Sequence, residues 1–234
     1  MNIKDLERIF SIEVTDEELF KKALTHSSYT KENSLDSLLN YERLEFFGDS
    51  VLKLAVSEIL MNKFPKSDEG ELTKIRSIIV SDAMLSKVAM NLGLTEFIIL
   101  GKNAEKAGER KRSSINACIF EALLGAFYLT GKKTEIIEFL GKVFEPEITD
   151  VKNNFAKYNA KEILQEYTQS KTKDLPEYSL IREFGPKHEP TFEVEVIYQG
   201  EVLACMTGKS KKEAEQKCAY EACKKLGVIK DERK

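Results

Sequence analysis

Three carboxylates follow one another at helical spacing in one short stretch of the chain. Residues 40–52 read NYERLEFFGDSVL, which places Glu42, Glu45 and Asp49 at positions i, i+3 and i+7. At a rotation of about 100° per residue, the three side chains point to within ~60° of one another. Like charges at this spacing repel, so the pattern indicates either a solvated helix face or a site that binds a cation.

A fourth carboxylate lies in a segment where a charge is unexpected. Residues 113–128 read SSINACIFEALLGAFY and are almost wholly apolar apart from Glu121. A carboxylate in such a helix is rarely buried without a partner. If Glu121 joins Glu45 and Asp49, three hard oxygen ligands meet, a set suited to Mg²⁺ or Mn²⁺ and to phosphodiester hydrolysis by a metal-activated water. Small residues would let the two helices pack closely there: Ala117, Ala122, Gly125 and Ala126.

The elements that carry these residues are expected to be helices. Apolar residues recur at i, i+3 and i+4 through most of residues 1–145, and Gly and Pro separate the periodic runs. The pattern predicts a mostly α N-terminal domain over residues 1–150. The polar stretch 151–158 is the predicted linker.

After the linker the hydrophobic period changes from helical to alternating. Helices are expected at 160–170 and 209–226, and strands at 177–183, 191–199 and 201–207, with a tight turn at Gln199-Gly200. This α-β-β-β-α order predicts a small α+β domain over residues 159–229, with both helices on one face of an antiparallel sheet. Cys205, Cys218 and Cys223 are expected in its core.

Composition excludes several classes of protein. The 234 residues are 42% hydrophobic and 32% charged, which is typical of globular chains and not of disordered ones. The sequence has no apolar run long enough for a membrane span and no secretory signal at its start, so we expect a cytoplasmic protein without membrane contact. The formal net charge of −3 does not by itself indicate a nucleic-acid partner.

Four motifs in order resemble one known family. They are residues 40–52, residues 23–29 (ALTHSSY), residues 68–76 (DEGELTKIR) and residues 120–126 (FEALLGA). Together they resemble the ribonuclease III family, and residues 159–227 are similar to its double-stranded RNA-binding domain. The resemblance implies an all-helical endonuclease domain that forms a homodimer and cuts double-stranded RNA, leaving 5′-phosphate and 3′-hydroxyl ends. It also implies a role in processing ribosomal RNA precursors and other structured transcripts.

The resemblance assigns the metal-binding and catalytic roles to Glu45, Asp49 and Glu121. Glu42 and Glu69 fall in supporting places, and the implied cofactor is Mg²⁺, with Mn²⁺ as a second candidate. One ligand does not carry over, because Cys118 stands where the family pattern has an aspartate. A neutral thiol is a poor ligand for Mg²⁺, although a thiolate accepts softer ions.

Three explanations for Cys118 remain open at this point. The other carboxylates and water complete the coordination shell; or the nuclease is weakened and the chain acts mainly as a double-stranded RNA-binding protein; or Asn116 or a neighbour replaces the missing ligand.

Two further residues of the first domain have specific expected roles. The resemblance implies that Phe46 inserts into the partner subunit of a dimer, with ordinary core packing as the alternative. His26 is expected to be a hydrogen-bonded structural residue and not a proton carrier.

The expected RNA contacts of the second domain come from three of its elements. The first helix offers polar groups to the minor groove, the loop before the second strand enters the next groove, and the last helix presents cations and its N-terminus to phosphates. The residues concerned are Gln165, Glu166, Pro186, His188, Ser210, Lys211, Lys212 and Gln216.

Overall fold

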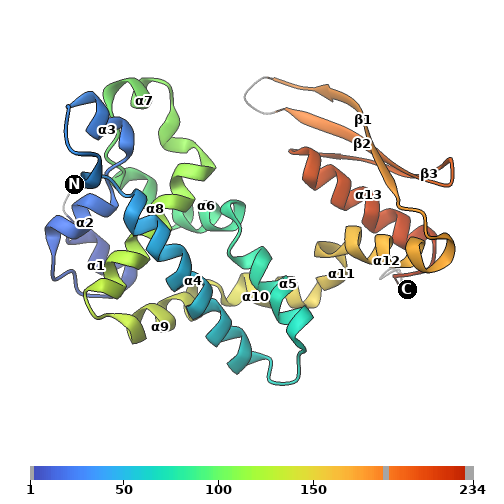
Figure 1. Ribbon diagram of the computed structural model, residues 1–234, viewed down its shortest axis with the longest axis horizontal. Coiled ribbons are helices and arrows are strands. Elements are labelled where there is room, and N and C mark those ends of the chain that lie inside the picture. Colours follow the sequence, from blue (N-terminus) through green and yellow to red (C-terminus); the bar gives the residue numbers. More distant parts are fainter. Residues whose placement is uncertain (1–2, 187–189, 230–234) are drawn as a thin grey trace. The chain divides into compact units, whose positions relative to one another are not determined.

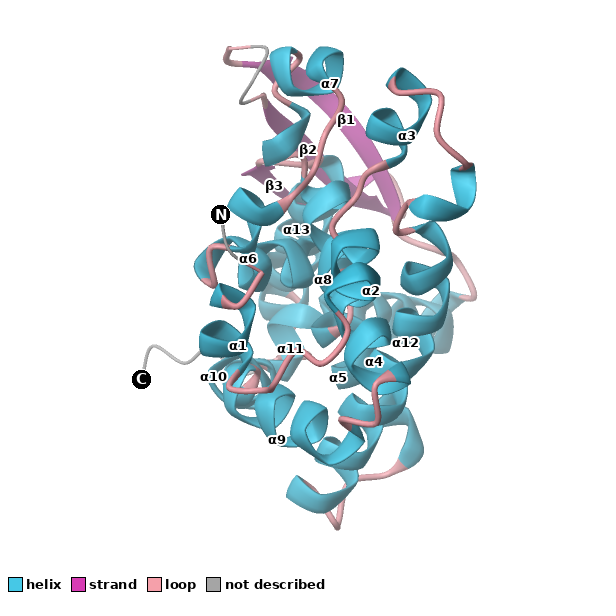
Figure 2. Ribbon diagram, turned by 90° about the vertical axis from the view of Figure 1, so that its left-hand side faces the viewer, coloured by secondary structure: helices cyan, strands magenta, loops and turns pink. Residues whose placement is uncertain are grey.

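The computed structural model describes residues 3–186 and 190–229. The chain divides into two compact units, Met1–Thr149 and Asp150–Lys234. Figure 1 shows the order of the elements, and Figure 2 distinguishes helices from strands by colour. The strands belong to the C-terminal unit. The expected fold class, an all-helical unit followed by a small α+β unit, is confirmed.

The first unit is built from helices, the last of which, Glu145–Asn153, continues past the boundary at Thr149. In chain order they are α1 (Asp5–Phe10), α2 (Glu17–Ala23), α3 (Ser27–Glu32), η1 (Ser37–Leu39), α4 (Glu42–Lys63), α5 (Glu69–Ile79), α6 (Asp82–Asn91), η2 (Leu94–Phe97), α7 (Lys102–Lys106), η3 (Glu109–Lys111), α8 (Ser113–Leu129), α9 (Lys133–Val143) and α10 (Glu145–Asn153). α8 is the central helix, with most of its residues buried, and α2, α4 and α6 pack around it. The carboxylates of interest therefore lie on the central helix and on its main neighbour, α4.

Side chains at the helix ends explain where several helices start and stop. Asp68 begins α5 by accepting a hydrogen bond from the Glu71 N–H at 2.8 Å, and Ser81 begins α6 in the same way. α4 ends at Lys63, directly before Phe64 and Pro65, as expected where a proline restricts the preceding residue.

The second unit contains α11 (Phe155–Tyr158), α12 (Ala160–Thr172), β1 (Glu177–Phe184), β2 (Thr191–Tyr198), β3 (Glu201–Gly208) and α13 (Lys211–Lys225). The strands form an antiparallel sheet in the order β1-β2-β3. Gln199 and Gly200 both have positive φ, the conformation of a two-residue hairpin turn. Residues 151–158, expected as a polar linker, are mostly helical.

The core of the second unit lies between the sheet and its two helices. Val194 and Val196 of β2 are buried against α13, and Cys218 and Cys223 are buried in α13. The expectation of a buried Cys205 is wrong, because this residue is exposed. Its cross-strand partner is Glu195, which lies between the two inward valines, so strand alternation turns Cys205 to the outer face.

Candidate active site

Two glycines let α4 and α8 cross with their backbones in contact. A Cβ atom added at Gly48 would lie 1.8 Å from the carbonyl oxygen of Glu121, and one added at Gly125 would lie 2.5 Å from that of Leu44. No side chain larger than hydrogen fits at either position. The close packing expected around Gly125 is therefore confirmed, and it fixes Glu45 and Asp49 beside the α8 segment that carries Glu121.

The three predicted ligands form a region of excess negative charge. Glu45, Asp49 and Glu121 are all half-buried. Burial, together with the neighbouring charges of Asp49 and Glu45, raises the pKa of Glu121 to about 8. Lys53 donates a hydrogen bond to Asp49 Oδ2 at 2.8 Å and partly offsets this charge. Such a cluster favours binding of a cation.

The carboxylates do not come together as a finished coordination shell. Within residues 3–186 and 190–229, no three His, Cys, Asp or Glu side chains lie close enough together to hold a metal ion. The expected meeting of three oxygen ligands is thus not seen at ligand distance. Like charges repel one another, so the side chains of a carboxylate cluster do not approach closely through their own interactions.

The two supporting glutamates lie at the starts of helices. Glu42 is exposed in the first turn of α4, and its N–H donates to Asn40 Oδ1 at 2.9 Å. Glu69 is exposed in the first turn of α5, which packs against α4. A negative charge in the first turn stabilises a helix through its dipole, so both glutamates stabilise their helices independently of any role in the site.

Cys118 lies half-buried on α8, one turn before Glu121. Its thiol interacts with the side chains of Glu45 and Tyr41. Burial, then the hydrogen bond and charge of Glu45, raise the pKa of the thiol well above its usual value. Without a metal ion, Cys118 is therefore a neutral thiol at neutral pH.

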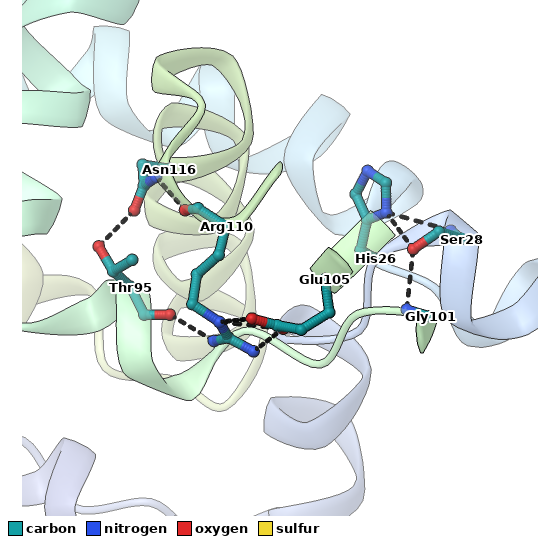
Figure 3. Close-up of polar contacts among 7 residues, drawn as sticks. All are labelled: His26, Ser28, Thr95, Gly101, Glu105, Arg110 and Asn116. Atoms are coloured by element: carbon teal, nitrogen blue, oxygen red, sulfur yellow. Dashed lines mark hydrogen bonds and ion pairs between the residues drawn. The ribbon is translucent and has the colours of Figure 1, made fainter. Parts of the chain in front are cut away.

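Asn116 does not replace the missing aspartate. It is 1% exposed, and its side chain is fully engaged elsewhere (Figure 3). Its Oδ1 accepts from Thr95 Oγ1 at 2.6 Å, and its Nδ2 donates to the carbonyl of Arg110 at 2.9 Å. Its Nδ2 also donates to the carbonyl of Arg112 at 3.0 Å. The amide holds the chain before α8, and its oxygen is hydrogen-bonded to the Thr95 hydroxyl.

Asp82 is an acidic neighbour that the sequence patterns missed. Its charge acts on Glu121 and contributes to the raised pKa of that residue. Asp82 is exposed at the start of α6, which packs on α8. No motif or periodicity in residues 80–84 marks it, and only the packing of α6 on α8 brings its charge near the site.

His26 has the structural role expected of it. Its Nδ1 accepts a hydrogen bond from the Ser28 N–H at 3.1 Å and lies 2.8 Å from Ser28 Oγ. Burial lowers the pKa of the ring below its usual value, which agrees with a neutral imidazole that accepts at Nδ1.

Phe46 is not a core residue, because it is 80% exposed. It lies beside a cavity of about 590 Å³ that is bordered by residues of α2, α4 and the end of α8, among them Leu19, Leu44, Phe47 and Leu129. An exposed aromatic ring next to an apolar hollow is typical of a protein–protein contact.

Most of the expected RNA-contacting residues of the second unit are exposed. Gln165 and Glu166 are exposed on α12, as are Pro186 before β2 and Lys211 and Lys212 in the first turn of α13. Ser210 begins α13 by accepting a hydrogen bond from the Glu213 N–H at 3.2 Å. His188 lies outside the described residues.

The side chain of Gln216 is engaged within the second unit. Its Nε2 donates to the carbonyl oxygen of Tyr158 and, at 3.3 Å, to that of Lys157. This side chain ties α13 to α11, which is a structural contact.

The ribonuclease III-like family model matches residues 16–148, and the double-stranded RNA binding motif matches residues 160–226. Among the described residues, no helix is long and apolar enough to cross a membrane. Proteins named Ribonuclease 3 are among the chain's relatives. That of Bacillus licheniformis is 40% identical over 95% of this chain and 89% of its own, and that of Pelotomaculum thermopropionicum is 43% identical over 90% and 87%.

The first unit is also similar to a solved structure of a ribonuclease III nuclease domain. The nuclease domain of ribonuclease III from Campylobacter jejuni is 38% identical, with a TM-score of 0.55, and the match covers 62% of this chain and 99% of that one. The Campylobacter jejuni domain shows structural flexibility in a region involved in dimer formation. The two matched domains and the relatives identify this chain as a member of the ribonuclease III family, an endoribonuclease that acts on double-stranded RNA.

Proposed function

We propose that this endoribonuclease cuts double-stranded RNA with the help of a divalent metal ion held by Glu45, Asp49 and Glu121. The observation that carries the proposal is the close crossing of α4 and α8 at Gly48 and Gly125, which fixes Glu45 and Asp49 beside the α8 segment that carries Glu121. The donor set, carboxylates from two tightly crossed helices, suits Mg²⁺ or Mn²⁺. When bound, such an ion supplies an activated water and neutralises charge on the phosphate.

The products are proposed to carry 5′-phosphate and 3′-hydroxyl ends, and the substrates to include ribosomal RNA precursors and other structured transcripts. Glu42 and Glu69 are proposed to support the metal site. The RNA-binding domain is proposed to span residues 159–229 and to contact RNA through α12, the loop before β2, and α13; the nuclease domain spans residues 1–150, and 151–158 join the two. A cytoplasmic location stays a prediction from the sequence.

The nuclease is proposed to act as a homodimer in which Phe46 of each subunit enters the cavity beside Leu44 and Leu129 of the other. The exposure of this ring and the apolar character of the hollow support the proposal. Because one patch would contain both the ring and the hollow, it would complement itself across a two-fold axis.

A second candidate function follows from Cys118. A neutral thiol in place of a carboxylate leaves the site with less charge to hold a metal ion. The alternative is therefore a double-stranded RNA-binding protein whose nuclease activity is slow or absent.

Cleavage of a long, perfectly paired RNA by the purified protein separates the two candidates. The reaction is run in Mg²⁺ and separately in Mn²⁺, with Glu121→Ala as the blank, and the ends of the products are determined. Short products that disappear with the Glu121→Ala variant support the metal-dependent nuclease. Binding without cleavage in both metals supports the second candidate.

A further inference from the structure

Tyr41 is a buried phenol directly before α4, and the metal site described above gives it no role. The residue is 6% exposed. Its N–H donates to the carbonyl oxygen of Thr25 at 2.9 Å, and its carbonyl oxygen accepts from the Glu45 N–H at 2.8 Å. The backbone of this tyrosine is therefore joined directly to the backbone of a proposed metal ligand.

The ring of Tyr41 is held against the residues that begin α3. The centroids of the Tyr41 and His26 rings are 5.6 Å apart, and the His26 N–H donates to the carbonyl oxygen of Ile99 at 2.9 Å. Ser28 contacts the imidazole at Nδ1 and accepts from the Gly101 N–H at 3.0 Å (Figure 3). A buried ring packed in this way has little freedom to turn, so the direction of its hydroxyl group is fixed.

The hydroxyl of Tyr41 is hydrogen-bonded to the thiol of Cys118 on α8. The same thiol is hydrogen-bonded to the carboxylate of Glu45 on α4. Cys118 reaches both groups because Gly48 and Gly125 let the two helices approach to backbone contact. The side chains of Tyr41, Cys118 and Glu45 thus form one hydrogen-bonded relay.

The chemistry of the three groups fixes the direction of the relay. An ionised carboxylate only accepts hydrogen bonds, so the thiol donates its one proton to Glu45. The sulfur atom can then only accept, and the Tyr41 hydroxyl is its donor. The relay therefore runs from phenol to thiol to carboxylate.

The carboxylate at the end of the relay is one that its neighbours repel. Glu45 shares the site with Asp49 and Glu121, and like charges repel one another. A free glutamate side chain would turn away from this charge. A donor bound to the carboxylate keeps it in place and leaves lone pairs of the same group for a cation. Binding of an ion then costs less, because the ligand is already oriented.

This arrangement accounts for a thiol at the position where the resemblance has a fourth ligand. A neutral thiol is a poor ligand for Mg²⁺, but it can accept from a phenol and donate to a carboxylate at the same time. An ionised aspartate at position 118 could bind the ion but has no proton to donate to Glu45.

We propose that Tyr41 and Cys118 are positioning residues, which orient the Glu45 carboxylate through the relay so that it binds the divalent ion, while the thiol itself does not touch the ion. This inference rests on the proposed metal-dependent cleavage of double-stranded RNA. It gives Cys118 a supporting role in place of the role of a ligand.

Binding of Mn²⁺ to the full chain without RNA tests the relay. Electron paramagnetic resonance measures the affinity for the unsubstituted chain, for Tyr41→Phe, for Cys118→Ala and for the double variant, and the melting temperature in EDTA checks that each is folded. Tyr41→Phe keeps the buried ring and removes only the hydroxyl. The matched control is Tyr178→Phe, which removes a buried hydroxyl of the second unit that has no hydrogen-bond partner among the described residues.

Each single change at the relay is expected to weaken Mn²⁺ binding about three- to tenfold, the effect of losing one hydrogen bond. The double variant should bind like Cys118→Ala, because the hydroxyl acts only through the thiol. Cys118→Ser should restore most of the affinity, since a hydroxyl also accepts and donates. Tyr178→Phe should bind Mn²⁺ as the unsubstituted chain does.

Co²⁺ shows directly whether the sulfur touches the ion. A thiolate bound to Co²⁺ gives an intense sulfur-to-metal charge-transfer absorption, which carboxylate ligands do not give. The unsubstituted chain with Co²⁺ is expected to lack this absorption. An absorption that is present and disappears with Cys118→Ala overturns the inference, because the thiol would then be a ligand.

The Mn²⁺ measurements can also overturn the relay without affecting the proposed function. Unchanged affinity in Tyr41→Phe, with binding by the unsubstituted chain intact, overturns the relay alone. Additive losses in the double variant do the same, because the two residues would then act independently, and so does an equal loss in Tyr178→Phe. An unsubstituted chain that binds no Mn²⁺ overturns the proposed function and this inference together.

Discussion

Glu121 carries a charge that folding disfavours. Burial and the nearby Asp49 and Glu45 raise its pKa to about 8, against an ordinary value of 4.5. The folded protein therefore binds this proton more tightly than the unfolded chain does. The stabilisation that results is complete below pH 4.5 and is lost as the pH rises through about 8.

Glu121→Gln is accordingly expected to stabilise the protein when no divalent ion is supplied. In EDTA at pH 8.5, the free energy of unfolding should rise by about 1 to 3 kcal/mol, a range discounted for the partial exposure of the site. At pH 4.5 the variant and the unsubstituted chain should unfold alike. Urea denaturation across this pH range measures the difference, with Glu58→Gln, an exposed glutamate of α4, as the control. If the difference in unfolding free energy between Glu121→Gln and the unsubstituted chain does not change with pH, the expectation is contradicted.

Cys118→Asp should have opposite effects on stability and on activity. A new carboxylate beside Glu45 and Glu121 adds repulsion, so we expect the melting temperature in EDTA to fall. The same charge should strengthen divalent-metal binding and raise Mg²⁺-dependent turnover. Cys118→Asn, which keeps a neutral side chain, is the matched control for both measurements. A turnover that stays level or falls in the aspartate variant would show that the thiol is not what limits the site.

At the scale of elements, the connection from η2 to α8 depends on one buried amide. Asn116→Leu removes the side-chain partner of the Thr95 hydroxyl and of the Arg110 carbonyl, whereas the Arg112 carbonyl keeps its hydrogen bond from the backbone N–H of residue 116. Buried polar groups left without partners cost about 1 to 3 kcal/mol, so we expect a loss of that size in the free energy of unfolding. Asn103→Leu, on the exposed face of α7, should change it by less than about 0.5 kcal/mol. Equal effects of the two changes would contradict a special role for Asn116.

The elements that were predictable from the sequence are those with a strong local signal. Helical periodicity predicts the α-helical unit, and strand alternation with the turn at Gln199-Gly200 predicts the α-β-β-β-α unit. Cys205 was misassigned because its inward or outward direction depends on the pairing register between β2 and β3. That register is a long-range property, which composition and spacing within β3 do not reveal.

In the candidate site, too, some features are visible in the sequence and others depend on how separate helices pack. The stripe of Glu42, Glu45 and Asp49 is visible in the sequence because helical geometry is local. The contribution of Asp82 and the contact of Cys118 with Tyr41 depend on how separate helices pack. The bonding of Gln216 to Tyr158 likewise depends on the placement of α11, which no pattern in α13 indicates.

At the scale of the whole molecule, the exposed ring of Phe46 bears on the assembly. Phe46→Ala is expected to weaken self-association about tenfold or more, because a buried aromatic anchor typically contributes at least 2 kcal/mol to an interface. Sedimentation velocity over a range of protein concentrations measures this change. Leu175→Ala, an exposed apolar residue of the other unit, should leave the association unchanged. A Phe46→Ala variant that associates as the unsubstituted chain does would remove this ring from the interface.

The contact of Gly48 with the α8 backbone has a consequence for the behaviour of the site on heating. Where helices are separated by side chains, their spacing follows the rotamers that those side chains populate, and it loosens as temperature rises. Here main chain meets main chain, so van der Waals contact between backbone atoms sets the spacing, and little can change at the crossing until the helices separate altogether. Cleavage activity should therefore persist nearly to the melting transition and then disappear with it, without a gradual decline beforehand.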